Sequence, residues 1–228
     1  MTSQQNHLIK TALKINKTAL FNSSAAVQPI DIKLSQGLDL IYHDYAFKNY
    51  NNAINFSKNI LRIDFSFKGS ISFIKNNQKH IFLEPGFLKI SKSSTDHNIY
   101  STDNGHYQGV TIIIDQDKIS SNFQYLIAKN NLLKNLVDDY DLDNGHAILK
   151  SEYIDQMFHD IKSVEVPNQL QYYCLKIAEL LLYLDSKTAH SASLSPEYFF
   201  IENTQKIYAI HQYLRNNLNK KNHFKIIS

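Results

Sequence analysis

Residues 61–67 read LRIDFSF, and this stretch shows most directly which kind of fold the chain adopts. Its apolar residues alternate with polar ones, which include Arg62 and Asp64. Successive side chains of a β-strand point to opposite faces, so a period of two predicts a strand with one buried face. Lys68 and Gly69 end the stretch, and another apolar run follows at once.

Short segments on both sides of this strand have the same character. Asn76 and Asn77 predict a turn between two apolar runs, and Glu84-Pro85-Gly86 predicts a tight turn, because Pro presets φ and Gly accepts a positive φ. Several short strands separated by turns are typical of a small antiparallel barrel or sandwich. The predicted strands cover residues 38–43, 61–67, 71–74, 80–83, 87–91 and 109–115.

After about residue 116 the apolar period becomes helical. The pattern predicts two short helices within 120–137 and longer ones over 151–163 and 168–185. The predicted fold class is therefore α+β, with an antiparallel β-barrel followed by α-helices.

The helix predicted over 168–185 has apolar residues at alternating three- and four-residue steps. Such a seam is typical of a dimerisation helix, but a helix packed on its own core gives the same pattern, and the sequence leaves both interpretations open. The seam residues are Leu170, Tyr173, Ile177, Leu180 and Leu184.

Composition excludes several classes of protein. The chain has 228 residues, 43% of them hydrophobic, and a net charge of +3, which is too small to indicate nucleic-acid binding. A single cysteine, Cys174, cannot form an internal disulfide, which favours a cytoplasmic location. Three lysines interrupt the apolar residues of the N-terminus, so we expect no membrane segment or signal peptide there.

Catalytic and metal-binding patterns are also missing from the sequence. The six glycines are scattered singly, and no His-x-His pair resembles the ligand set of a metal-dependent barrel enzyme. We therefore expect no metal, no cofactor and no enzymatic activity.

A ligand pocket, if present, is expected inside the barrel. Arg62 is one of two arginines and could hold a carboxylate or phosphate there. The simpler interpretation is that Arg62 faces solvent beside Asp64. The further candidates are His80 and Lys89 as polar groups, and Tyr42, Phe73 and Phe82 as apolar walls.

Two motifs resemble the AraC/XylS family of transcription regulators. Leu83-Glu84-Pro85-Gly86, followed by His97-Asn98-Ile99-Tyr100, is similar to a turn and strand of the family's sensor barrel, although Phe87 replaces the frequent Asp. Residues 207–218, IYAIHQYLRNNL, resemble the first helix of its DNA-binding domain. Residues 224–228 resemble the start of the next helix.

The resemblance implies a cupin-like sensor barrel, a helical dimerisation region and the beginning of a DNA-binding domain. It divides the chain into an N-terminal extension (1–36), a barrel (37–116), a helical region (117–185), a linker (186–202) and a truncated DNA-binding domain (203–228). The implied partners are a small-molecule effector, a second copy of the chain and, through the missing recognition helix, DNA. The alternatives are a stand-alone cupin-like enzyme and a shortened regulator that forms mixed dimers with a full-length relative.

Overall fold

The computed structural model describes residues 29–46, 49–52, 59–75, 79–92, 98–102, 105–127, 131–143, 145–163 and 165–190 of the chain. The turn predicted at 76–77, His97 of the second motif, most of the N-terminal extension and the whole of 203–228 lie outside these residues.

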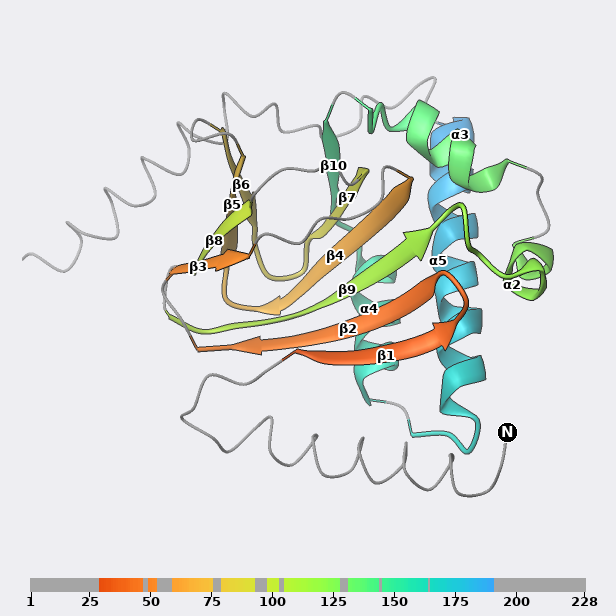
Figure 1. Cartoon of the computed structure of the whole chain (residues 1–228), viewed down its shortest axis with the longest axis horizontal. Coiled ribbons are helices and arrows are strands. Elements are labelled where there is room, and N and C mark those ends of the chain that lie inside the picture. Colours follow the sequence, from red (N-terminus) through yellow and green to blue (C-terminus); the bar gives the residue numbers. More distant parts are fainter. Residues whose placement is uncertain are drawn as a thin grey trace, which may run out of the picture.

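Two antiparallel sheets form the β part of the molecule (Figure 1). The larger sheet has the strand order β1-β2-β9-β4-β7-β10. Its strands are β1 (Ile30–Ser35), β2 (Leu38–Tyr45), β9 (Tyr107–Asp115), β4 (Ile60–Lys68), β7 (Leu88–Lys92) and β10 (His146–Leu149). The smaller sheet has the order β3-β8-β5-β6, with β3 (Asn49–Asn52), β8 (Asn98–Thr102), β5 (Ile71–Lys75) and β6 (Lys79–Leu83).

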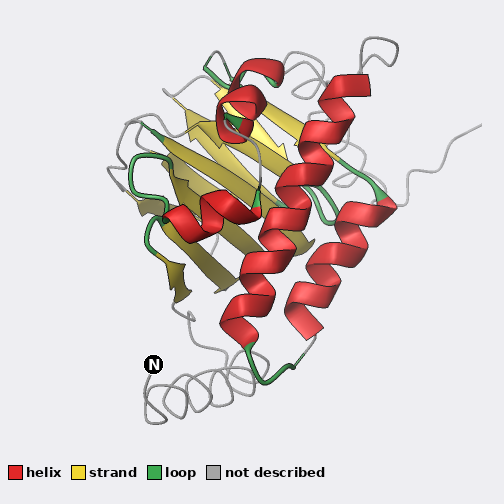
Figure 2. Cartoon of the chain, turned by 90° about the vertical axis from the view of Figure 1, so that its right-hand side faces the viewer, coloured by secondary structure: helices red, strands yellow, loops and turns green. Residues whose placement is uncertain are grey.

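Four helices pack on one face of the larger sheet (Figure 2). They are α2 (Ser121–Leu126), α3 (Leu132–Asp139), α4 (Glu152–Ser163) and α5 (Gln169–His190). The hydroxyl of Ser120 caps the first of them by accepting a hydrogen bond from the backbone N–H of Phe123 at 3.3 Å. The predicted α+β class, an antiparallel β unit followed by helices, is confirmed.

The alternation of β4 decides which face meets the helices. Phe65 stacks on Phe158 of α4 with ring centroids 4.3 Å apart, and Leu61 and Ile63 are buried on the same side. The opposite face turns toward the smaller sheet, because Tyr107 of β9 packs there against Ile71 and Leu83. The side chains between those of Leu61, Ile63 and Phe65 therefore point into the space between the sheets.

The larger sheet includes one strand from before and one from after the range predicted for the barrel, 37–116. β1 pairs with β2 and begins before residue 37, while β10 follows α3 and pairs with β7. The main hydrophobic core joins the strands of the larger sheet to the four described helices. The boundary predicted at 116 is therefore not a boundary of the core, and α5 continues past the predicted linker start at 186.

Candidate functional site

A polar row crosses the inner face of the larger sheet. Asp64 on β4 stands at the same register level as Thr111 on β9 and Lys89 on β7. His43 on β2 joins the row through Thr111. Four neighbouring strands thus place polar side chains on the face opposite the helices. The alternation of apolar and polar residues in β4 predicts that its polar side chains lie on this face.

The Asp64 carboxylate is the centre of this row and is 1% exposed. Oδ1 accepts hydrogen bonds from the Thr111 hydroxyl at 2.6 Å and from Arg62 Nε at 2.8 Å. Oδ2 accepts a hydrogen bond from Lys89 Nζ at 2.9 Å. The buried charge is therefore compensated by two cations and a hydroxyl, as burial of a carboxylate requires.

The surroundings change the protonation of two groups in the row. Burial by itself raises the pKa of Asp64, but the charges of Arg62 and Lys89 and the Thr111 hydrogen bond together hold this pKa well below its usual value. Burial lowers the pKa of His43 to about 4, and the positive charge of Arg62 acts in the same direction. Near neutral pH the row contains an ionised Asp64 and a neutral His43.

Hydrogen bonding also assigns the tautomer of His43. The Thr111 hydroxyl has one hydrogen, which it donates to Asp64. Its oxygen, 2.7 Å from His43 Nε2, must then accept a hydrogen bond from that nitrogen. Neutral His43 therefore carries its proton on Nε2, and its Nδ1 has the lone pair of a hydrogen-bond acceptor.

Of the predicted site residues, Arg62 and Lys89 meet in this row. The simpler interpretation, in which Arg62 faces solvent beside Asp64, is wrong, because the side chains of these two residues are 13% and 1% exposed. Sequence reasoning had not included His43 or Thr111. Alternation alone could have placed them on the inner face, but their contacts depend on the pairing of β2 with β9.

The aromatic candidates do not join the row. The hydroxyl of Tyr42 donates a hydrogen bond to the backbone carbonyl of Ile161 at 3.1 Å, so this ring lies on the helical side of the sheet. Phe82 is buried, but it points opposite to its neighbour Leu83, which packs in the cluster between the sheets. Neither ring lies in the polar row. Phe73 and His80 belong to β5 and β6, and their side chains lie outside the described part of the structure.

The predicted dimerisation seam packs within the protomer. Four of its five side chains are at most 1% exposed and belong to the main core, and Leu170 packs against the edge of that core. The buried four are Tyr173, Ile177, Leu180 and Leu184. This seam cannot also form a surface between copies, so the core-helix interpretation holds.

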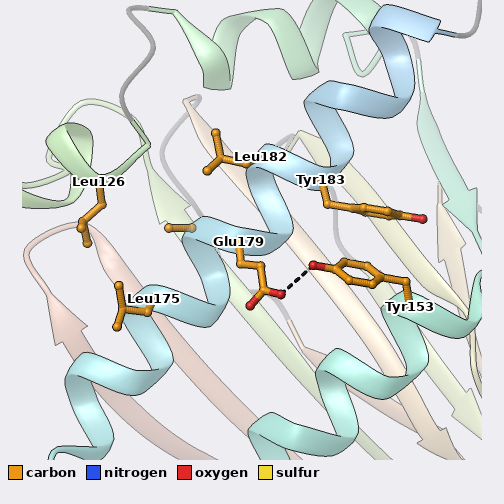
Figure 3. Close-up of a pocket in the computed structure, with 7 residues that line it drawn as sticks. Leu126, Tyr153, Leu175, Glu179, Leu182 and Tyr183 are labelled. Atoms are coloured by element: carbon orange, nitrogen blue, oxygen red, sulfur yellow. Dashed lines mark hydrogen bonds between the residues drawn. The ribbon is translucent and has the colours of Figure 1, made fainter.

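The opposite side of α5 borders an open apolar groove of about 490 Å³ (Figure 3). One wall is Leu126 of α2, and the other contains Tyr153 of α4 and Tyr183 of α5, whose rings stack 4.4 Å apart. The Tyr153 hydroxyl donates a hydrogen bond to Glu179 at 2.6 Å. Leu175, Ala178, Glu179 and Leu182 complete the lining.

The described ranges also bear on metal binding and on membrane spans. No group of three or more His, Cys, Asp or Glu side chains in them is arranged to hold a metal ion. Within the same ranges, none of the helices combines the length and apolar character needed to cross a bilayer.

Comparison with known proteins gives similarities of architecture. No family model matches the chain, and no curated protein matches it significantly. Fatty-acid-bound ToxT from Vibrio cholerae strain SCE256 aligns with a TM-score of 0.46 and 12% identity over 87% of this chain and 67% of its own. The AraC-like transcriptional activator CuxR aligns with a TM-score of 0.41 and 10% identity over 83% of this chain and 65% of its own.

A smaller β protein also aligns. The EutQ protein of Clostridium difficile has a TM-score of 0.33 and 15% identity over 43% of this chain and 69% of its own. This chain spans about two thirds of the length of each of the three proteins. Similarities at this level assign neither a family nor an activity.

Proposed function

We propose that the chain is the sensor part of an AraC-type transcription regulator and binds a small-molecule effector between its two sheets. The observation that carries this proposal is the polar row on the inner face of the larger sheet. A sandwich that served only as a scaffold would fill this face with apolar side chains, as it does on the helical side. Charged groups inside a fold are found more often at binding sites than in cores that serve only as a scaffold.

The chemistry of the row favours an effector with an anionic group. Arg62 and Lys89 offer cationic donors, and a guanidinium can hold a carboxylate or phosphate through two hydrogen bonds. An effector with a carboxylate or phosphate would match these donors. We propose binding, rather than catalysis, as the role of this site.

Regulation requires that the effector binds one arrangement of the protein more tightly than another. The row extends to β7, and β7 pairs with β10, which directly precedes α4. An effector that shifts Lys89 would therefore act on the segment that positions α4 and α5. Pairing with a second copy and a cytoplasmic location stay predictions. The pairing surface cannot be the seam that α5 buries in the core, and DNA contact would belong to residues beyond the sensor.

Native mass spectrometry of the purified protein tests effector binding. We expect an additional small-molecule mass on the wild-type protein and its loss in Arg62→Gln and in Lys89→Gln. Lys118→Gln is the matched control, because Lys118 is 65% exposed and pairs with Asp115 at the surface. Circular dichroism establishes that each variant is folded. A mass that persists in both folded row variants would contradict the proposed site.

A further inference from the structure

The outward side of α5 carries an apolar stripe with the same spacing as its buried seam. Leu175 and Leu182 are 56% and 40% exposed, and Ala178 lies between them at steps of three and four residues. Leu126 of α2 faces this stripe across the groove and is 40% exposed (Figure 3). Large apolar side chains gathered in an open groove mark a surface that binds another element.

The shape of the groove suits a helix. Its floor at Ala178 is a methyl group, whereas Leu175 and Leu182 rise on either side. These leucines are seven residues apart, which corresponds to about 10.5 Å along a helix. A helix packed over α5 would therefore fit best with apolar side chains that recur after seven residues and one between them.

We propose that the groove docks this chain's own segment 203–217, which lies outside the described residues. The sequence predicts a helix there with Ile207, Ile210 and Leu214 on one face. These three residues span seven positions with one apolar residue between the outer two, as do Leu175, Ala178 and Leu182. Packed antiparallel to α5, the segment brings Ile207 to Leu182, Ile210 to Ala178 and Leu214 to Leu175.

The length of the chain permits this arrangement. α5 ends at His190, and 12 residues, 191–202, connect it to the segment 203–217. An extended connection of that length reaches about 40 Å. The return from His190 to Leu182 covers only about 12 Å along α5, plus about 10 Å between packed helices. The antiparallel direction requires the shorter return from His190, because α5 ends on the Leu182 side of the groove.

The charges of the two partners have complementary signs. Glu179 is the charged residue that lines the groove, and it pairs with Lys176 at 3.1 Å. From residue 203 to the end the sequence contains lysines and an arginine but no acidic residue. In the antiparallel arrangement His211 and Arg215 lie near Glu179. A segment with acidic residues at these positions would be repelled.

This docking goes beyond the proposed sensing function and does not depend on an effector. The segment resembles the first helix of a DNA-binding domain, and docking would give it a defined position against α5. The site between the sheets and the segment would then communicate through α5.

Disulfide cross-linking of the full chain tests the proposal. Cys174→Ala removes the native thiol, and Leu182→Cys with Ile207→Cys places one thiol on each partner. Under mild oxidation with diamide at micromolar protein concentration, we expect an intramolecular disulfide in most molecules. The control pair, Glu84→Cys with Ile207→Cys, uses an exposed residue on the turn between β6 and β7 and should cross-link at least tenfold more slowly.

The products separate the possible occupants of the groove. Disulfide-linked dimers whose yield rises with concentration would show that a second copy docks there, and they would overturn the proposal. Equal rates in the two pairs would also overturn it. As an independent measurement, hydrogen exchange of 203–217 should accelerate at least tenfold in Leu182→Glu, but not in Ser186→Glu on the exposed end of α5. Equal exchange in these two variants and the wild type would contradict docking.

Discussion

Thr111 and Asp64 stand side by side on neighbouring strands, and the Thr111 hydroxyl donates a 2.6 Å hydrogen bond to the buried carboxylate. This bond orients Asp64 so that Oδ2 faces Lys89, and it fixes the tautomer of His43. One hydroxyl thus organises a row of polar groups across four strands.

Removal of the Asp64 charge should destabilise the fold strongly. Asp64→Asn leaves Arg62 and Lys89 without their shared carboxylate, and breaking a buried ion pair costs about 3–5 kcal/mol. The matched control is Asp143→Asn, because Asp143 pairs with Lys92 at the surface and is 62% exposed, so its loss costs less than about 1 kcal/mol. Urea unfolding measures both variants. Similar losses would show that Asp64 is not the centre of a buried network.

Stability should fall as the pH falls from about 6.5 to about 4. The pKa of His43 is about 4 in the folded protein against 6.5 for a free histidine. Between these values the unfolded chain binds a proton that the folded chain does not, so stability rises with pH. His43→Gln should flatten this part of the profile. Asp64 affects stability at a lower pH than His43 does. Because its pKa is depressed in the folded protein, its contribution to stability is lost only as the pH falls below about 3.8. Urea unfolding at a series of pH values measures both proteins. Parallel curves of unfolding free energy against pH for wild type and His43→Gln would contradict the prediction.

A charge in the buried seam of α5 should unfold the protomer instead of separating a dimer. Leu184 is fully buried, so Leu184→Asp places an uncompensated carboxylate in the core, at a cost that exceeds about 4 kcal/mol. Tyr125→Asp, at a position 85% exposed and outside the groove, should keep its circular dichroism spectrum and lose at most about 1 kcal/mol. A folded, monomeric Leu184→Asp protein would instead support the seam as a surface between copies.

Gly109→Ala should disturb the packing of Tyr107. A Cβ atom at this position would lie 2.1 Å from the Tyr107 hydroxyl oxygen and 2.8 Å from the backbone oxygen of Phe65. Tyr107 is buried, so the clash should cost about 1–3 kcal/mol. At Gly145 a new Cβ meets no atom within 4 Å, and Gly145→Ala serves as the control. Thermal unfolding compares the two; equal midpoints would show that Tyr107 moves without cost.

The sequence predicted local structure well and long-range contacts poorly. The period of two at 61–67 predicted β4 and its buried face, because alternation depends only on the strand itself. The contact between Asp64 and Lys89 joins residues 25 positions apart, and it follows from the register of β4 with β7. No local pattern contains that register. Arg62 was therefore recognised as a candidate, but its environment was not.

The two stripes of α5 show a second limit. Ile177 and Leu184 are buried in the core, whereas Leu175 and Leu182 lie on the outward side, and both pairs are seven residues apart. An amphipathic period identifies the helix, but it cannot distinguish two apolar stripes. The sheet and the other described helices, which pack against one side of α5, decide which stripe is internal.

The position of β10 has a consequence for how the chain folds. This edge strand is separated from β7, its partner, by β8, β9 and two helices, so the larger sheet is complete only after residue 149 has been synthesised. Until then the free edge of β7 presents unpaired N–H and C=O groups to other chains. Pairing over such a sequence distance is intrinsically slow. A nascent chain that stopped near residue 116 would therefore be prone to aggregate, and translation through β10 is a condition for productive folding.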